Sequence, residues 1–415
     1  KTTHTDKENS VIFYIARQPI FDRRRGLFAY ELLFRDGFDN AFPDIDSDEA
    51  TERLVESSEL STGIEALTGQ NRAFINFTEQ SICNQLPQLL PKQNTVVELL
   101  ETVAPTDDVF QSVTSLKDKG YTVALDDFEF DDRWQRFLPL IDIVKMDFRA
   151  LSIAQIKQQM RAHRGFTGRY LAEKVETYDE FKQALELGFD YFQGYFFAKP
   201  EVIQRRSLSA SQKVYLELLD KVSADDYNPD EIAQIIERDT GVSYKLLRFV
   251  NSAFFARRSE ITSLKQAVVR LGQAEIRKFV ALISTASLGE SKPNELTQLS
   301  ITRARFCEQL AQMNPRYGAD PGTAFLSGLL SKLDAMMDDE LSQILTHIHA
   351  GTTIRDALID KKGAIGFFLI TAEAIERVHW KKIDQAAKQL KLSSDTVIKL
   401  YHDASSWARA ASGSA

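Results

Sequence analysis

The sequence predicts an α/β domain followed by an all-helical domain. Short β-rich runs alternate with amphipathic stretches up to about residue 200, and only helix-period patterns follow from residue 207 onward. A chain of 415 residues is also long enough to fill two hydrophobic cores of ordinary size. We therefore expect one domain at 1–206 and a second at 207–415, joined through a polar, serine-rich segment at 202–211.

Seven β-rich runs divide the first half of the chain. They are VIFYIA (11–16), AFINF (73–77), TVVELL (95–100), YTVALDDF (121–128), DIVKMDF (142–148), RYLAEKV (169–175) and DYFQGYFF (190–197). Amphipathic stretches such as 110–119 and 178–187 lie between them, and a further helix is expected near 49–67. This alternation predicts a largely parallel sheet. The count is close to that of a closed (β/α)₈ barrel, and an open doubly wound sheet is the alternative.

The second half of the chain carries the spacing of amphipathic helices. We expect helices at 211–222, 229–239, 262–271 and 274–288. No β-rich run interrupts them, which predicts a helical domain.

Charge and composition exclude several classes of protein. The net charge of −8 argues against a protein that coats a nucleic-acid polymer, which needs a basic surface. Cys83 and Cys307 lie far apart and read as thiols of a reducing compartment. The polar segment 1–10 has no apolar signal core, and the apolar runs are too short to cross a bilayer. We expect a soluble cytoplasmic protein.

Acidic and amide side chains recur within or at the ends of the β-rich runs of the first half. A charge at such a position is costly unless it is paired, hydrated or bound to metal. In a barrel, the carboxyl ends of the strands meet at one rim, so these side chains converge there. Carboxylate and carboxamide oxygens are the ligands of hard divalent cations. The candidate metal ligands are Glu31, Asn76, Glu98, Asp126, Asp127 and Glu173.

Three further features refine this hypothesis. The adjacent carboxylates of Asp126 and Asp127 repel each other unless positive charge lies beside them, which two metal ions would supply. Lys145 interrupts an apolar run, where it either acts on water and phosphate or forms a salt bridge to one of the carboxylates. Gln193 is a polar residue in a buried-looking run, followed by Gly194, which permits a close backbone approach.

Eight ordered sequence blocks resemble the EAL domain family over about the first 200 residues. The blocks are QPIFD (18–22), YELLFR (30–35), FINFT (74–78), VVELLET (96–102), VALDDF (123–128), IVKMD (143–147), LAEKVET (171–177) and QGYFFAKP (193–200). The resemblance implies a TIM-like barrel that hydrolyses cyclic di-GMP to pGpG with two Mg²⁺ or Mn²⁺ ions.

The same resemblance implies a role for each matching residue. Glu31, Asn76, Glu98 and Asp126 are similar to the ligands of one metal, and Asp126 bridges to a second metal held by Asp127 and Glu173. Lys145 and Gln193 match positions around the nucleophilic water. Glu101 matches a glutamate that braces the loop after the aspartate pair, and Gln18 and Arg35 match residues that contact the nucleotide.

The chain departs from the family pattern at several places. The signature triplet reads Glu31-Leu32-Leu33, which keeps the ligand, and the spacing from Glu31 to Asn76 is short. The loop after the aspartate pair reads DDFEFDDRW (126–134), with bulky and charged residues in place of small ones. Lys174 replaces a glycine beside Glu173. These changes put metal affinity and regulation in question, although every direct ligand is present.

The segment 232–283 resembles the HDOD domain, a non-catalytic relative of HD phosphohydrolases. The stretch AFLSGLLSKLD (324–334) has Ser331 and Lys332 where an HD enzyme carries its His-Asp ligand pair. His347 and His349 have no nearby carboxylate pair to complete a site, and read as surface or packing residues. This half is predicted to regulate or bind a partner.

The leading hypothesis is a two-metal cyclic di-GMP phosphodiesterase regulated by its HDOD domain. The main alternative is a receptor that binds cyclic di-GMP through the barrel and signals through HDOD contacts. A scaffold that keeps the acidic residues for structural reasons is the third possibility. The expected partners are cyclic di-GMP and either another protein or a second copy of the chain.

Overall fold

The structure is a computed structural model that describes residues 14–35, 64, 68–126, 132–163, 165–199, 210–224, 228–238, 242–243 and 272–414. Internal contacts divide the chain into two compact units. The first unit is Lys1–Val175 with Phe181–Gly194, and the second is Glu176–Glu180 with Tyr195–Ala415. The predicted boundary at 206/207, the predicted helix at 262–271 and nearly all of the predicted helix at 49–67 lie outside the described residues.

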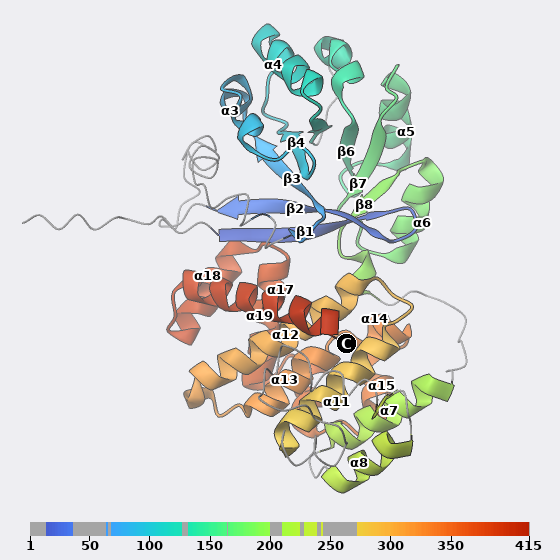
Figure 1. The fold of residues 1–415 in the computed structure, drawn as a ribbon, viewed down its shortest axis with the longest axis vertical. Helices are drawn as coiled ribbons and strands as arrows, with labels where there is room; N and C mark the ends of the chain where they lie inside the picture. The colour runs from blue at the N-terminus through green and yellow to red at the C-terminus, as the bar shows by residue number, and fades with distance from the viewer. Residues whose placement is uncertain are drawn as a thin grey trace, which may run out of the picture. The chain divides into compact units, whose positions relative to one another are not determined.

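The first unit contains a closed eight-stranded barrel (Figure 1), which confirms the predicted barrel and excludes an open sheet. The strands are β1 Tyr14–Asp22, β2 Leu27–Arg35, β3 Arg72–Phe77, β4 Thr95–Leu99, β5 Thr122–Leu125, β6 Ile143–Asp147, β7 Arg169–Glu173 and β8 Tyr191–Gln193. Strands β2 to β8 run parallel in chain order, whereas β1 pairs antiparallel with both β2 and β8. Strand β2 is the one that the seven β-rich runs did not include.

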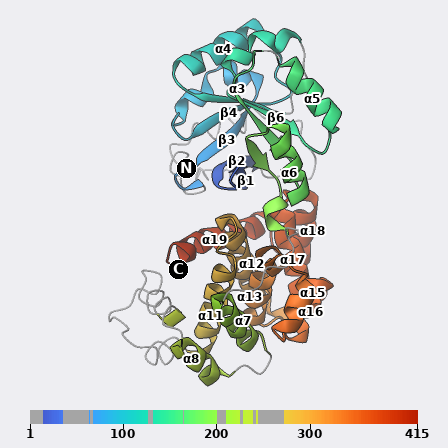
Figure 2. The same cartoon turned by 90° about the vertical axis from the view of Figure 1, so that its right-hand side faces the viewer.

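Alternation along the strands fills the barrel. One apolar cluster takes a single residue from each of seven strands, namely Ile20, Ala29, Phe74, Val96, Ala124, Ile143 and Leu171. Ile20 and Ala29, Phe74 and Val96, and Ala124 and Ile143 are register partners, whereas the next neighbour along the sheet is offset by two residues in each case. This stagger is the one that closes a barrel and places the seven side chains in one layer. The helices α3 Glu79–Cys83, α4 Asp107–Asp118, α5 Ile153–Ala162 and α6 Tyr178–Leu187 cover the outside of the strands (Figures 1 and 2).

Strands β7 and β8 join tightly just beyond their last residues. The Val175 amide donates a hydrogen bond to the Gln193 carbonyl oxygen at 2.9 Å. Gly194 follows with a φ of +143°, and a Cβ at this position would lie 2.1 Å from the Val175 carbonyl oxygen. Only glycine fits here. This close approach fixes the ends of two strands that carry candidate site residues.

The second unit is helical, as predicted. Its described helices are α7 Ala210–Ser223, α8 Pro229–Arg238, α11 Gln273–Leu288, α12 Asn294–Met313, α13 Pro321–Leu330, α14 Leu333–Met337, α15 Leu341–His347, α16 Thr352–Ile359, α17 Gly363–Glu376, α18 Trp380–Leu390 and α19 Ser394–Ser414. Helix α12 lies at the centre, against α13, α17 and α19 (Figure 2). A Cβ on Gly328 of α13 would lie 2.5 Å from the Arg303 backbone, so glycine permits a close contact between α13 and α12.

No described helix combines the length and the apolar character that crossing a membrane requires.

Candidate functional site

Four carboxylates of the barrel surround the ammonium group of Lys145. The Nζ atom lies 2.7 Å from Glu173 Oε1, 3.0 Å from Asp126 Oδ1 and 3.7 Å from Glu31 Oε1, and it also donates to Glu98 Oε1. The Lys145 side chain is only 1% exposed and the Glu98 side chain 0%. We call Lys145 and these four residues the acidic cluster.

The barrel topology explains why these residues meet. Asn76 and Glu98 are register partners on β3 and β4, one residue before each strand ends. Asp126 follows directly after β5, and Glu173 ends β7. The carboxyl ends of parallel strands form one rim, so side chains far apart in the sequence converge there. Lys145 lies in the middle of β6 and extends its long side chain to them.

Gln193 at the end of β8 completes the polar group. Its Nε2 donates to Gln18 Oε1 at 2.8 Å and to Glu31 Oε2 at 2.5 Å. Gln18 and Glu31 are register partners on the antiparallel pair β1 and β2. Two residues predicted for different tasks, Gln18 for the nucleotide and Gln193 for the attacking water, therefore share one hydrogen-bonded contact.

Burial and mutual repulsion favour the neutral forms of two acids. Burial raises the pKa of Glu98 well above its usual range against the pull of Lys145, and the neighbouring carboxylates add to the rise. Burial likewise raises the pKa of Glu173 to about 8, with Lys145 opposing it and Asp126 and Glu31 reinforcing it. Burial lowers the pKa of Lys145, but the four carboxylates outweigh it and keep the ammonium charged.

The acidic cluster has more acceptor capacity than its own donors use. One ammonium faces four carboxyl groups, so ionisation of all four would leave excess negative charge in a buried site. The raised pKa values of Glu98 and Glu173 express the cost of that charge while no cation is bound. The buried oxygens Asn76 Oδ1, Glu98 Oε2 and Gln193 Oε1 have no hydrogen-bond partner. Buried, unpaired oxygen ligands with excess negative charge fit a hard divalent cation. Among the described residues, however, no three acidic, histidine or cysteine side chains are already arranged to hold one.

The remaining candidate residues are not placed at the cluster by the structure. Asp127 and the side chain of Arg35 lie outside the described part of the chain. Glu101 is described, and it is exposed in the turn after β4. Most of the loop that it is predicted to brace lies outside the described residues. The roles assigned to these three residues stay predictions.

Lys174 adopts a conformation that suits the glycine expected from the family pattern. Its φ is +54°, in the left-handed region that disfavours a side chain. The ammonium group lies 2.6 Å from Asp147 Oδ2, which turns the side chain away from the acidic cluster toward the end of β6. The extra bulk next to Glu173 is therefore directed at Asp147, not at the cluster.

His347 and His349 of the helical unit each contact another residue of the chain. His347 Nδ1 lies 2.9 Å from the Gln343 carbonyl oxygen, and His349 Nδ1 lies 2.8 Å from Asp220 Oδ1. Both side chains are exposed, in agreement with the interpretation as surface residues.

The fold and the site together define a two-domain protein whose buried polar site belongs to a TIM-like barrel. Comparison with family models matches the EAL domain over residues 64–200 and the HDOD domain over residues 208–357. Cyclic di-GMP phosphodiesterase CdgJ of Vibrio cholerae is 39% identical over 95% of this chain and 92% of its own length. The chain belongs to the family of proteins that join an EAL domain to an HDOD domain.

A second relative agrees with this family. The protein YuxH of Bacillus subtilis is 34% identical over 95% of this chain and 97% of its own length. Among solved structures, a manganese and cyclic di-GMP complex of Klebsiella pneumoniae BlrP1 shares 20% identity with a TM-score of 0.37, covering 47% of this chain and 56% of that one. This structural similarity is too low to bear on the family assignment.

Sequence reasoning missed the central place of Lys145. It weighed a catalytic role against a salt bridge to one carboxylate, whereas the structure shows ion-pair contacts to four. A cation in an apolar run was the available signal. The number of its partners depends on the barrel curvature, which no local pattern encodes.

Proposed function

We propose that this protein is a metal-dependent phosphodiesterase that hydrolyses cyclic di-GMP to pGpG in the cytoplasm and that its HDOD domain regulates the reaction. The observation that carries the proposal is the buried excess of carboxylates around Lys145, with oxygens that lack partners. The similarity to a relative named as a cyclic di-GMP phosphodiesterase supports the choice of substrate.

The residues of the cluster divide by the chemistry of their atoms. Glu31, Asn76, Glu98 and Asp126 would hold one divalent cation, and Asp126, Asp127 and Glu173 a second, with Mg²⁺ and Mn²⁺ as the proposed ions. When bound, such ions supply an activated water and stabilise negative charge on phosphate oxygens. Lys145 contributes a fixed, buried positive charge close to Glu173 and Asp126, where it orients the attacking water.

Other residues would bind and orient the substrate. Gln193 donates to Glu31, which holds that carboxylate in one orientation, and its free Oε1 is available to a hydrogen-bond donor. Arg35 would hold a phosphate through charge-assisted hydrogen bonds, with Gln18 beside it. Glu101 would brace the loop after the aspartate pair.

Incubation of the purified protein with cyclic di-GMP and Mn²⁺ or Mg²⁺, followed by chromatography, tests this proposal. We expect pGpG to accumulate, and a chelator or Glu31→Ala to abolish it because a ligand of the first metal is lost. Absence of pGpG with either ion would overturn the phosphodiesterase assignment.

A receptor is the second candidate function. The observation in its favour is the bulky and charged sequence that follows Asp126, in the loop next to the proposed metal ligands. A receptor would bind cyclic di-GMP without producing pGpG and signal through a partner or a second copy of the chain. Calorimetry with cyclic di-GMP, run beside the hydrolysis assay, separates the two functions.

A further inference from the structure

Two segments that follow barrel strands belong to the helical unit. The chain leaves β8 at Gln193 and passes through Gly194 into Tyr195, the first residue of the longer part of the helical unit. It leaves β7 at Glu173 and enters the same unit at Glu176. We call residues 195–199 the strap. Glu173 and Gln193, both members of the candidate site, therefore lie within three residues of the helical unit.

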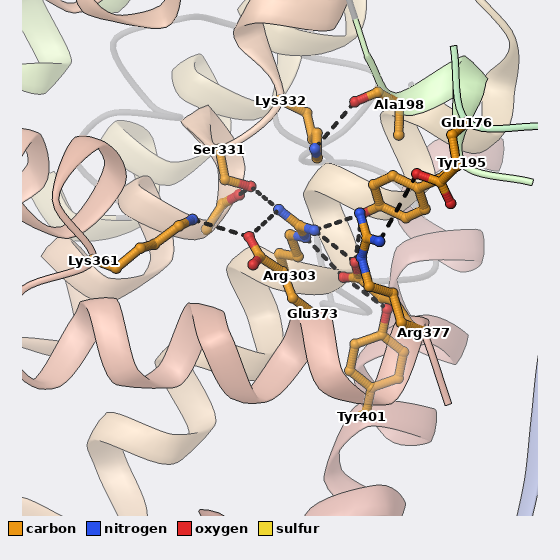
Figure 3. Close-up of polar contacts among 12 residues, drawn as sticks. Glu176, Tyr195, Ala198, Arg303, Ser331, Lys332, Lys361, Glu373, Arg377 and Tyr401 are labelled. Atoms are coloured by element: carbon orange, nitrogen blue, oxygen red, sulfur yellow. Dashed lines mark hydrogen bonds and ion pairs between the residues drawn. The ribbon is translucent and has the colours of Figure 1, made fainter. Parts of the chain in front are cut away.

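Arg303 of α12 binds the strap at its first residue, and Figure 3 shows the surrounding contacts. Its Nη2 donates to the Tyr195 hydroxyl at 2.6 Å. Its Nε and Nη2 donate to the two carboxylate oxygens of Glu376 at 2.7 and 2.6 Å, and the Tyr195 hydroxyl donates to the same carboxylate at 2.6 Å. The side chains of Arg303 and Glu376 are 1% and 4% exposed. A buried, two-pronged ion pair of this kind holds a fixed geometry.

The residues that replace an HD ligand pair also serve this network. Ser331 Oγ accepts a hydrogen bond from Arg303 Nη1 at 3.2 Å. Lys332 Nζ donates to the Ala198 carbonyl oxygen at 3.1 Å and lies 5.1 Å from the centre of the Tyr195 ring. Both residues therefore contact the strap or the arginine that holds it (Figure 3).

The second segment, which begins at Glu176, also contacts residues of the helical unit. Glu176 Oε2 lies 3.2 Å from the strap residue Lys199 and 3.9 Å from Arg377, whose guanidinium lies 4.7 Å from the centre of the Tyr195 ring. The two segments are thus tied to each other within the helical unit. In the barrel, the Val175 amide and the Gln193 carbonyl tie the same two chain sections one step earlier.

We propose that Arg303, supported by Glu376, Ser331 and Lys332, is a positioning residue of the helical domain that sets the ends of β7 and β8 and through them Glu173 and Gln193. It touches neither substrate nor metal and acts through Tyr195. The proposal rests on the phosphodiesterase function, and it names the route by which the helical domain regulates the barrel. A displacement of about 1 Å at reacting groups costs up to roughly a hundredfold in rate, so small shifts of these strand ends suffice.

The test compares variants of the full chain. Arg303→Met removes the guanidinium, Arg303→Lys keeps the charge without the two-pronged geometry, and Tyr195→Phe keeps the ring while removing one hydroxyl. Lys278→Met is the matched control, because in the part of the chain that the structure describes the ion pairs of Lys278 are to Glu275 of α11 and to the buried Glu308 of α12, not to the strap. If Arg303→Met fails to fold, Tyr195→Phe still tests the proposal, because it removes only one hydroxyl group.

Three readouts separate positioning from general stability. We expect Arg303→Met to lower kcat roughly tenfold or more, with KM unchanged within about twofold. Tyr195→Phe should lower kcat by about threefold, and the kcat of Arg303→Lys should lie between those of the other two variants. Hydrogen exchange at the Val175 amide should accelerate in the same order. Lys278→Met should leave kcat, KM and the Val175 exchange rate unchanged, although it lowers the midpoint temperature of unfolding.

These experiments distinguish failure of the phosphodiesterase assignment from failure of the positioning role. If the wild type produces no pGpG, the phosphodiesterase assignment fails, and Val175 exchange together with calorimetric Mn²⁺ affinity still tests the positioning role. Faster exchange and weaker Mn²⁺ binding in Tyr195→Phe and Arg303→Met, absent in Lys278→Met, would support it. Unchanged Val175 exchange in both strap variants, or equal changes in the control, would overturn it.

Discussion

The barrel and the helical unit each bury a group of charged side chains, and the two groups differ in how fully they are paired. They are the acidic cluster and the Arg303 network, which consists of Arg303, Glu376, Tyr195, Ser331 and Lys332. In the cluster, one lysine faces four carboxylates and buried oxygens stay unpaired. In the network, Arg303 meets Glu376, Tyr195 and Ser331, and each contact is a hydrogen bond.

The same difference is seen in the pKa values of two buried glutamates, Glu98 of the acidic cluster and Glu376 of the Arg303 network. Burial raises the pKa of Glu98 well above its usual range, and Lys145 does not offset this. Burial also acts to raise the pKa of Glu376, but Arg303 and the hydroxyl of Tyr195 overcome it and hold the pKa below its usual range. A satisfied ion pair maintains structure, whereas an acidic group with excess charge is prepared to receive a cation.

The largest expected effect is on activity. Glu98→Gln removes one carboxylate from the cluster at nearly constant shape, and we expect kcat for cyclic di-GMP hydrolysis to fall by at least about a hundredfold. Glu308→Gln is the control, because Glu308 is equally buried but pairs with Lys278 and Arg305 in the helical unit. It should retain activity within about twofold. Similar losses in both variants would remove the distinction between a functional and a structural acid.

The next effect concerns stability, and its sign differs between the regions. Glu376→Gln leaves the buried Arg303 without its counter-charge, and we expect the free energy of unfolding to fall by about 3 kcal/mol or more. Glu98→Gln relieves repulsion in the cluster, so the metal-free protein should be unchanged or stabilised by about 1 kcal/mol. Urea unfolding in the presence of a chelator measures both. A large loss in Glu98→Gln would show that the cluster is itself a balanced structural network.

A smaller effect is the pH dependence contributed by Lys332. Burial and the charge of Arg303 lower its pKa from 10.5 to about 8. Between these values the unfolded chain holds a proton that the folded chain has lost, so stability rises with pH across this window and is constant below it. Lys332→Met should remove a slope of at most about 1.4 kcal/mol per pH unit. Urea unfolding from pH 8 to 10 measures it, and identical slopes would contradict this assignment.

The sequence was sufficient to predict which polar residues lie near the carboxyl ends of the barrel strands. Glu98 lies one residue before the end of β4 and Glu173 ends β7, and the closed barrel brings both strand ends to one rim. Strand β2 was missed as a β-rich run because its leucine, alanine and glutamate residues are typical of helices.

The Arg303 network could not be predicted in the same way. Arg303 lies 73 residues from Glu376 and 108 from Tyr195, and each reads locally as an ordinary polar residue. Gly328 allows the contact between α13 and the backbone at Arg303, but nothing in the sequence around Gly328 predicts that contact. Partners this distant are fixed only by the packing of α12 against α13 and α17.

Calorimetric titration of the chelator-treated protein with Mn²⁺ tests most directly whether the excess charge of the acidic cluster serves to bind cations. We predict binding to the wild type and to Glu308→Gln with equal affinity, and an affinity at least about tenfold weaker for Glu98→Gln, because one buried anionic ligand is lost. Equal Mn²⁺ affinity in all three proteins, or no binding to the wild type, would contradict the account.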